Sequence, residues 1–378
     1  MNFDLIITGN TFGSFLTLFL LTKNFDISVA QIIPEISIIR DMKLFIPAST
    51  FKNIPIPFKT IMENDFQTYN RISLYLFNQE KTLQSEKKII ISTTLDKIRK
   101  FLQNNIKNPR KYKTFQGTIK EVHFNNDKIF IKLSNNKIIS SQYLIVCDDF
   151  WGSIWNLINF KPQHTGGWII KTPLTTTIKS KPFIAFGYSK KGTILSDSEN
   201  IIFAKHINKE YTIEDLISNF LLTNKIVEKL VIKDWNKYVL PFTTKNYSFH
   251  NEIKNKKIFF VTEYLGLVNC FLPEYTTLTS MLARELSDHL DTKIKTLEDF
   301  TPLLNKIIEY NQIFLKLSNF INSFPLIFFK NEEKDKLIID ILIGNINPQI
   351  MDDRLRKIFE NYDRNFEVTL SERALTES

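Results

Sequence analysis

The segment at residues 258–275, IFFVTEYLGLVNCFLPEY, combines the residue types with the most evident chemical use in this chain. An apolar run, typical of a buried parallel strand, leads to Glu263, whose carboxylate could accept a hydrogen bond from a sugar-alcohol hydroxyl. Gly266 lets the backbone approach a ligand closely, and Pro273 suits the first position of a helix whose free N–H groups would face the site. We therefore predict a ligand-contacting turn in this segment. Its candidate contacts are Glu263, Gly266, Leu267, Val268 and Asn269.

The N-terminus, FDLIITGNTFGSFLTLFLLTKNFDISVAQ, has the order strand, tight turn, helix and strand that is typical of a dinucleotide-binding unit. In the fingerprint G-x-G-x-x-G, the first glycine makes the turn, the second lets the backbone approach a pyrophosphate, and the third lets helix and strand pack closely. Gly9 holds the first position, Thr11 and Ser14 occupy the other two, and Gly13 lies one residue early. Gln31 replaces the acidic residue expected at the end of the second strand, and its amide can still accept one hydrogen bond. The candidate contacts are Gly9, Phe12, Gly13 and Gln31, and the alternative is an emptied unit of the same shape.

A third segment places an aspartate directly after a short apolar strand. Residues 143–146 are predicted to form this strand, and Cys147 and Asp148 follow it. Asp148 is a candidate cofactor contact, and its alternative role is that of a loop or helix-capping residue.

These three segments resemble motifs of the FAD-dependent geranylgeranyl reductase-like family, within the flavin monooxygenase-like superfamily. The second FAD-contact motif of the family is G-D-A-A-G-x-V-N-P-x-x-G-E-G, in which Glu263 replaces the Asp of the motif. Identical matches stand at Gly266, Val268, Asn269 and Glu274. Asp148 matches the Asp of the family's A-D-G-x-x-S-x-x-R motif, which approaches the ribityl and pyrophosphate region. The resemblance spans residues 3–340 and implies an FAD cofactor and reduction of prenyl-lipid double bonds.

A chain of 378 residues suits a two-domain α/β protein. We expect a Rossmann-like FAD-binding domain, interleaved with an antiparallel-sheet substrate domain and followed by C-terminal helices. The parallel sheet is expected at residues 3–8, 27–31, 143–146 and 258–261. The expected ranges are 1–160 and 240–300 for the FAD-binding domain, 161–239 for the substrate domain, 301–362 for the helical region and 363–378 for a mobile tail.

Charge and cysteine content narrow the class of partner and compartment. The formal net charge is +9, and a basic stretch could attract an anionic membrane or be an ordinary solvated face. Its proposed contacts are Lys97, Arg99, Lys100, Arg110, Lys111 and Lys113. No nucleic-acid partner is expected, because no recognition motif accompanies these residues. Two cysteines without metal-ligand spacing favour a reducing compartment and no metal, and the absence of an apolar run of about 20 residues favours a cytoplasmic, possibly membrane-peripheral, protein.

Two functions of different classes remain open from the sequence. The first is a flavin-dependent oxidoreductase that acts on an isoprenoid or another apolar or lipid substrate. The second is a noncatalytic or repurposed relative that keeps the fold without FAD and acts as a binding or structural protein, a possibility that Thr11 at the second glycine position favours. No catalytic side chain is assigned, because a flavin carries the hydride chemistry itself. The sequence does not indicate an oligomeric state.

Overall fold

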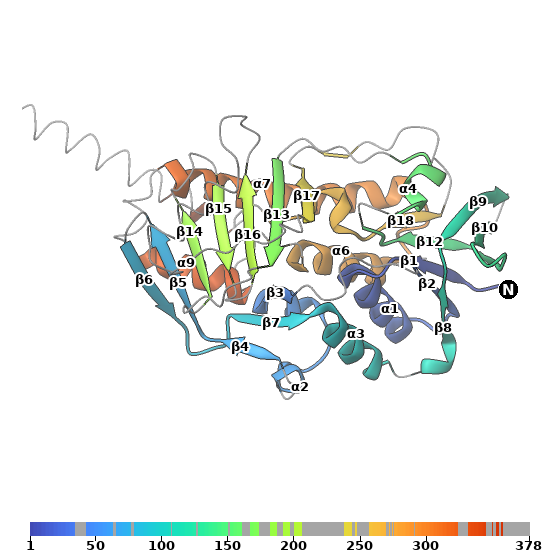
Figure 1. Ribbon diagram of the computed structural model, residues 1–378, viewed down its shortest axis with the longest axis horizontal. Coiled ribbons are helices and arrows are strands. Elements are labelled where there is room, and N and C mark those ends of the chain that lie inside the picture. Colours follow the sequence, from blue (N-terminus) through green and yellow to red (C-terminus); the bar gives the residue numbers. More distant parts are fainter. Residues whose placement is uncertain are drawn as a thin grey trace, which may run out of the picture.

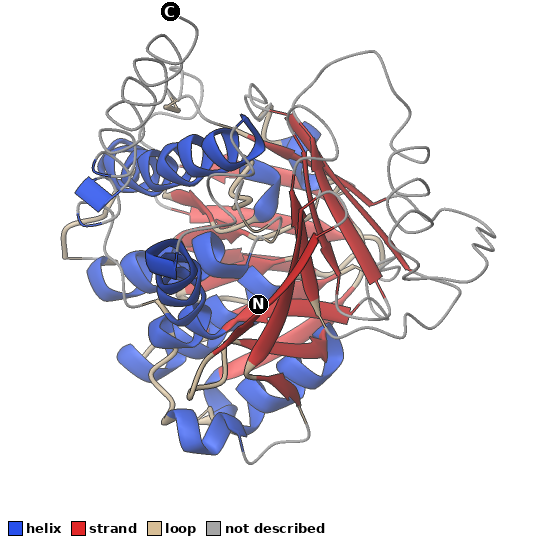
Figure 2. Ribbon diagram, turned by 90° about the vertical axis from the view of Figure 1, so that its left-hand side faces the viewer, coloured by secondary structure: helices blue, strands red, loops and turns tan. Residues whose placement is uncertain are grey.

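The computed structural model combines a parallel sheet with a larger, mostly antiparallel one (Figure 1). Figure 2 shows most of the described helices on one side of the strands. The residues that the structure describes are 1–34, 43–62, 66–76, 79–106, 108–125, 128–149, 152–160, 167–173, 182–186, 192–196, 200–205, 238–243, 246–247, 257–269, 272, 274, 276–290, 292–323, 332–344, 350, 353–354 and 357.

The parallel sheet has the strand order of a dinucleotide-binding fold. Its five strands run in the order β18-β12-β1-β2-β8, and every neighbouring pair is parallel. Their bounds are β1 (Leu5–Thr8), β2 (Val29–Ile33), β8 (Tyr112–Gln116), β12 (Tyr143–Val146) and β18 (Ile258–Phe260). Because the chain leaves β1 toward β2 on one side and later returns as β12 on the other, a topological switch point lies at the carboxyl end of β1. The predicted sheet is therefore confirmed.

The second strand differs from its prediction. Residues 27–31 were expected, but β2 covers Val29–Ile33, because the apolar pair at 32–33 continues the strand. Gln31 therefore lies inside the strand, level with Ile7 of β1, and not at its end.

Helices cover one face of the parallel sheet. The register places Ile7, Gln31, Ile145 and Phe259 on this face, and the ring of Phe259 lies 5.7 Å from that of Phe300 in α7 (Leu297–Ser323). Helix α1 (Phe12–Asn24) packs against both α3 (Leu95–Asn104) and α6 (Thr276–His289), and its residues from Phe12 to Leu21 are all buried. This environment explains why α1 is apolar all round.

The opposite face carries smaller elements. Trp155 of α4 (Ile154–Leu157) stacks 6.0 Å from the ring of Phe260 in β18. A three-stranded antiparallel sheet adjoins this region, with β9 (Ile119–Asn125), β10 (Lys128–Leu133) and β11 (Ile138–Ser141).

The larger sheet contains seven strands in the order β17-β13-β16-β15-β14-β5-β6. The strands expected in the substrate domain are β13 (Gly167–Pro173), β14 (Phe183–Phe186), β15 (Gly192–Ser196) and β16 (Asn200–Lys205). The sheet also includes β5 (Arg71–Leu76), β6 (Gln79–Gln84) and β17 (Tyr238–Phe242). Since β5 pairs in parallel with β14, residues from the expected FAD-binding range extend this sheet, and the two units interleave more deeply than the sequence indicated.

Shorter elements connect the two large sheets. A further sheet joins β3 (Lys43–Pro47), β7 (Ile90–Thr94) and β4 (Gln67–Tyr69). The short helices are α2 (Phe58–Met62) and the 3₁₀ turns η1 (Ala48–Asn53), η2 (Pro109–Lys111) and η4 (Glu263–Leu265). After α7 comes α9 (Glu332–Ile343), so the C-terminal region is helical where it is described, whereas the expected tail at 363–378 lies outside the described residues. Within the described part of the chain, no helix has both the length and the apolar character to cross a membrane.

Part of the basic stretch is compensated by nearby acids. Arg99 and Lys100 form ion pairs with Asp96, and Lys111 pairs with Asp26. Such exposed pairs add little stability, but they lower the net charge of this surface. Membrane contact by this surface stays a prediction.

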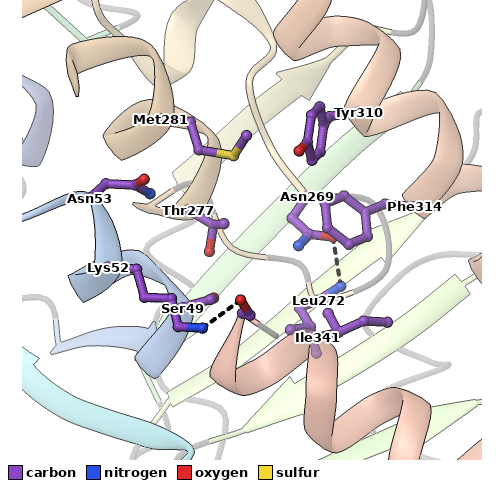
Figure 3. Close-up of a pocket in the computed structure, with 11 residues that line it drawn as sticks. Ser49, Lys52, Asn53, Asn269, Leu272, Thr277, Met281, Tyr310, Phe314 and Ile341 are labelled. Atoms are coloured by element: carbon purple, nitrogen blue, oxygen red, sulfur yellow. Dashed lines mark hydrogen bonds between the residues drawn. The ribbon is translucent and has the colours of Figure 1, made fainter. Parts of the chain in front are cut away.

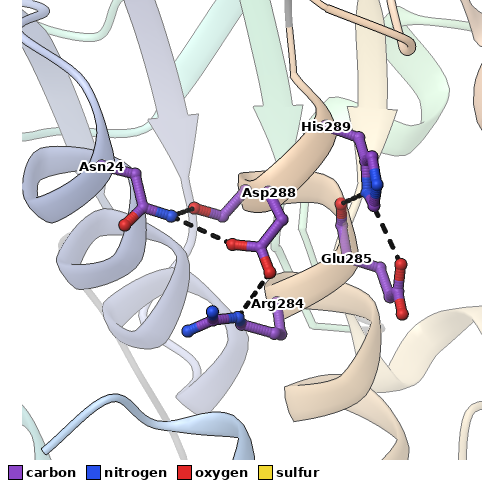
Figure 4. Close-up of polar contacts among 6 residues, drawn as sticks. Asn24, Arg284, Glu285, Asp288 and His289 are labelled. Atoms are coloured by element: carbon purple, nitrogen blue, oxygen red, sulfur yellow. Dashed lines mark hydrogen bonds and ion pairs between the residues drawn. The ribbon is translucent and has the colours of Figure 1, made fainter.

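A polar cluster joins the ends of α1 and α6 (Figure 4). The amide nitrogen of Asn24 donates to the hydroxyl of Ser287 at 3.0 Å and to the carboxylate of Asp288 at 3.1 Å. Arg284 donates to the same carboxylate at 2.6 Å. One side chain of α1 therefore ties the last turn of α1 to the last turns of α6.

We expect Asn24→Ala to lower the free energy of unfolding by about 1 kcal/mol, because two hydrogen bonds are lost and the buried Ser287 loses a donor. The exposed Asn108, whose side chain makes no cap bond to η2, provides the matched control. Asn108→Ala should change stability by less than about 0.5 kcal/mol. Equal effects of the two substitutions in urea unfolding would contradict the proposed role of Asn24.

Candidate cofactor site

The turn after β1 is built around Gly9. This residue has φ +101°, and a Cβ on it would lie 2.4 Å from the carbonyl oxygen of Cys147, at the end of the neighbouring β12. Both observations exclude a side chain here, so Gly9 lets the backbones of β1 and β12 meet at the switch point.

The start of α1 makes a second close approach. A Cβ on Gly13 would lie 2.4 Å from the carbonyl oxygen of Val261, directly after β18. Gly13 therefore allows the close helix-to-sheet packing that the third glycine of the fingerprint provides. The spacing of the sequence motif assigns that role to position 14, but Ser14 has another one.

Thr11 and Ser14 cap α1 reciprocally. The Ser14 N–H donates to Oγ1 of Thr11 at 3.2 Å, and the Thr11 N–H donates to Oγ of Ser14 at 3.1 Å. The Thr11 hydroxyl donates in turn to the carbonyl oxygen of Cys147 at 2.7 Å. The residue at the second glycine position thus points at β12, and it is only 3% exposed. Phe12, which follows it, has no exposed surface.

Asp148 lies at the same edge of the sheet, after β12. Its carbonyl oxygen accepts a 2.6 Å hydrogen bond from the hydroxyl of Thr262, and its carboxylate oxygen Oδ2 has no hydrogen-bond partner among the described residues. Burial raises the pKa of Asp148 to about 7, and the side chain of Thr8 only partly opposes this. Because α4 begins after Ser153, Asp148 does not cap that helix.

Gln31 is another buried polar residue whose side chain has no hydrogen-bond partner among the described residues. Its side chain has no exposed surface, and neither atom of its amide forms a hydrogen bond with any described residue. An unpaired buried amide costs about 1–3 kcal/mol. Such a group fits a ligand that supplies hydroxyls, which is the role predicted for this residue.

The turn predicted from the sequence is buried and tied to its surroundings. Glu263 begins the 3₁₀ turn η4, and Gly266 ends it in the left-handed conformation with φ +77°. The carbonyl oxygen of Gly266 accepts from the Thr243 N–H at 3.2 Å, which links the turn to the larger sheet after β17. Leu267 and Val268 have no exposed surface, so their side chains belong to the core.

A buried carboxylate stands at the N-terminus of α6. Glu274 accepts from the hydroxyl of Thr276 at 2.7 Å and from the N–H of Thr277 at 3.0 Å, and burial raises its pKa. Its main chain exchanges a 2.7 Å hydrogen bond with Asn269, whose N–H donates to the Glu274 carbonyl oxygen. The hydroxyl of Thr50 in η1 lies 3.1 Å from that of Thr277. The start of α6 is therefore held both by the turn that contains Asn269 and by η1.

A pocket of about 160 Å³ opens beside this helix end, between η1, α6, α7 and α9 (Figure 3). The ammonium group of Lys52 donates to the carbonyl oxygen of Gly344 at 2.6 Å and so joins η1 to the end of α9. The lining residues are Ser49, Lys52, Asn53, Asn269, Leu272, Thr277, Met281, Tyr310, Phe314, Ile341 and Gly344. Of these, only Asn269 was among the predicted contacts. The others come from segments far apart in the sequence, and no local motif identifies them.

The structure thus brings together Gly9, Gly13 and Asp148 at the carboxyl edge of the sheet. Glu263 lies near this group, because both Asp148 and Glu263 act on the thiol of Cys147. Burial raises the pKa of that thiol, and the negative charges of the two carboxylates raise it further. Gln31 lies one level deeper in the sheet, whereas Leu267 and Val268 are core residues of the adjoining turn.

Comparison with known proteins supports the fold. No protein-family model and no curated protein sequence matches the chain. Among solved structures, a flavoprotein/dehydrogenase from Cytophaga hutchinsonii is similar with a TM-score of 0.68 and 10% identity, over 96% of this chain and 100% of that chain. A geranylgeranyl bacteriochlorophyll reductase-like protein from Thermoplasma acidophilum gives a TM-score of 0.64 and 12% identity, over 94% and 99%. A p-nitrophenol 4-monooxygenase from Pseudomonas putida gives a TM-score of 0.57 and 9% identity, over 95% of this chain and 98% of that chain. The chain has the fold of these proteins.

Asp148 predicts a pH dependence of stability. Because its pKa rises from 3.8 to about 7 on folding, its contribution is most favourable below pH 4 and is lost as the pH rises through 7. Above that pH, ionised Asp148 costs on the order of 4 kcal/mol. Asp148→Asn should therefore have little effect near pH 4 and should stabilise the protein increasingly toward pH 8, measured by urea unfolding.

The exposed Asp299 gives a control of opposite sign. Hydrogen bonds from the N–H of Lys295, among others, lower its pKa. Asp299→Asn should therefore destabilise the protein at neutral pH and lose its effect as the pH falls below about 4. A pH-independent effect of Asp148→Asn would contradict the assigned pKa.

Proposed function

We propose that this chain binds FAD and acts as an oxidoreductase on an isoprenoid or another apolar or lipid substrate. The observation that carries the proposal concerns two of the buried groups that have no hydrogen-bond partner among the described residues, the Gln31 amide and the carboxylate oxygen Oδ2 of Asp148. Both lie near the switch point of a sheet with the strand order of a dinucleotide-binding fold. Such groups persist when a ligand compensates their burial.

The residues present fit the cofactor. Gly9 and Gly13 would lie near the pyrophosphate, with the N-terminus of α1 directed at it, and Gln31 would accept from the adenosine ribose. Asp148 and Glu263 would face the ribityl and pyrophosphate region, and the turn from Gly266 to Asn269 would border the flavin ring. When bound, the flavin would supply the hydride chemistry.

The protein's own contribution is orientation and exclusion of water. Asp148 and Glu263 are 6% and 1% exposed, so a ligand here would meet carboxylates in a low-dielectric environment, where hydrogen bonds are strong. The N-terminus of α6 carries partial positive charge that favours an anionic group, although the Glu274 carboxylate already accepts two hydrogen bonds there.

The pocket beside α6 supports an apolar substrate. Leu272, Met281 and Phe314 form apolar parts of its wall, whereas Asn269 and Thr277 supply polar groups beside the turn proposed to border the flavin. Ser49, Lys52, Asn53 and Tyr310 add further polar groups, so the wall is mixed. Concave sites that combine apolar side chains with polar groups are typical of small-molecule binding. We therefore propose that the reacting end of the substrate enters this pocket.

A noncatalytic relative is the second candidate, and two contacts favour it. Thr11 and Ser14 cap the helix end that a pyrophosphate would use, and Glu274 caps the helix end proposed to face the flavin. In such a protein the same fold would act as a binding or structural unit.

Substitution of Gln31 separates the two candidates. Gln31→Leu removes a buried amide that has no partner in the described part of the chain, so we expect the cofactor-free protein to gain about 1 kcal/mol of stability. If Gln31 accepts from the ribose, the same substitution should weaken FAD binding about tenfold, measured by titration calorimetry. Gain in stability and loss of affinity should therefore occur in one variant.

Gln142, which is exposed, is the matched control, and Gln142→Leu should leave FAD affinity unchanged. FAD binding to the original protein that Gln31→Leu does not alter would remove Gln31 from the site. No FAD binding to the original protein would favour the noncatalytic candidate.

We further propose a cytoplasmic location with peripheral contact to anionic membranes through the exposed residues Lys97, Lys100 and Arg110. Each basic residue near such a surface contributes about 1 kcal/mol. Replacing all three with alanine should lower the affinity for phosphatidylserine-containing vesicles about a hundredfold, measured by sedimentation with the vesicles. Added salt should have a similar effect, because it screens exposed charges beyond about 8–10 Å.

The control carries the same loss of charge elsewhere, at the exposed residues Lys293, Lys295 and Lys306. Equal binding of the original protein to neutral and anionic vesicles, or equal losses in both triple variants, would remove this surface from membrane contact.

A further inference from the structure

The hydroxyl of Thr11 is fully used within the protein. Its single hydrogen is donated to the carbonyl oxygen of Cys147 at 2.7 Å, and its oxygen accepts from the N–H of Ser14 at 3.2 Å. Ser14 completes the arrangement, since its hydroxyl accepts from the Thr11 N–H at 3.1 Å and lies 2.9 Å from the Thr11 carbonyl oxygen, to which it donates. Two N–H groups at the start of α1 are therefore already bound by side chains.

These are groups that an anion would use. The first N–H groups of an α-helix have no partner within the helix, and they bind phosphate where a dinucleotide fold places it. Thr11 stands at the fingerprint position where glycine normally lets the pyrophosphate come close to the backbone. Its side chain therefore competes with a pyrophosphate both for space and for donors.

The surrounding backbone cannot relieve this competition. Gly9 is held against Cys147, and Gly13 against Val261, each with a gap too small for a Cβ. A shift of the helix start would separate it from both strands. The side chain of Thr11 is the part of the turn that can rotate away without moving the sheet.

Independent observations indicate that a ligand belongs at this edge. Asp148, whose main chain touches the Gly9 turn, keeps a buried carboxylate oxygen without a partner among the described residues, and the deeper Gln31 keeps a whole amide in that state. The capped start of α1 would not by itself indicate a ligand site.

We propose that Thr11 closes the nucleotide site of the cofactor-free protein and limits its affinity for FAD, because the pyrophosphate must displace the Thr11 hydroxyl. This inference rests on the proposed function. It assigns Thr11 as the residue that opposes binding, whereas Gly9 and Gly13 permit it.

The test compares Thr11→Gly with the original protein by titration calorimetry. Thr11→Gly restores the missing glycine, and glycine is itself an acceptable N-cap, so the helix should still form. Affinity for FAD and for ADP should rise about tenfold or more, because both carry the pyrophosphate. Affinity for riboflavin, which lacks it, should not change.

Two further variants separate the causes. Thr11→Val keeps the volume and removes both hydrogen bonds, so it should gain less than Thr11→Gly. Thr22→Ala is the control, because it removes a hydroxyl that donates to Leu18 and Phe19 carbonyl oxygens near the other end of α1. Thr22→Ala should leave affinity for FAD unchanged. If Thr11→Gly fails to fold, Ser14→Ala frees the Thr11 N–H and should increase affinity for ADP.

The outcomes distinguish this inference from the proposed function. Binding of FAD to the original protein with no gain in Thr11→Gly would overturn the inference and leave the proposed function intact. Binding only to Thr11→Gly would support the inference and show that the natural chain excludes FAD. Absence of binding in both would overturn both, since removing Thr11 would then uncover no nucleotide site.

Discussion

The contact between three backbones at the carboxyl edge of the parallel sheet determines the rest of this structure. Gly9 lies against the carbonyl group of Cys147, and Gly13 lies against that of Val261, in both cases at a distance that no side chain permits. These contacts set α1 over the switch point of the sheet and bring the ends of β1, β12 and β18 together. The positions of Asp148 and Glu263 follow, because each comes soon after one of these strands.

This close packing also buries carboxylates, and burial is unfavourable for their charged form. Asp148, Glu263 and Glu274 are carboxylates with almost no exposed surface, and burial raises the pKa of Asp148 and of Glu274. The Gln31 amide adds a further group, which has no hydrogen-bond partner among the described residues. Polar residues of this kind are retained where a ligand or a strong hydrogen-bond network compensates them. For Glu274 the protein supplies part of this compensation itself, because the carboxylate accepts hydrogen bonds from Thr276 and Thr277.

Local patterns predicted most of the parallel sheet, because its strands are short apolar runs that end in glycine or polar residues. The bounds of β12 agree with prediction, and those of β1 and β18 differ at one end. The features that the sequence did not predict depend on contacts between residues far apart in the chain. The exact position of Gln31 depends on pairing between β1 and β2, and the packing role of Gly13 depends on the carbonyl group of Val261. The meeting of Thr50 with Thr276, 226 residues away, has no local signal at all.

The central claim is that this edge of the sheet holds FAD, and the absorption spectrum of the protein after incubation with FAD and removal of unbound ligand tests it most directly. If FAD binds at this edge, the protein should show the two-band spectrum of a bound flavin, in a ratio of about one flavin per chain. A colourless protein, from a sample whose folded state is confirmed by circular dichroism, would contradict the claim.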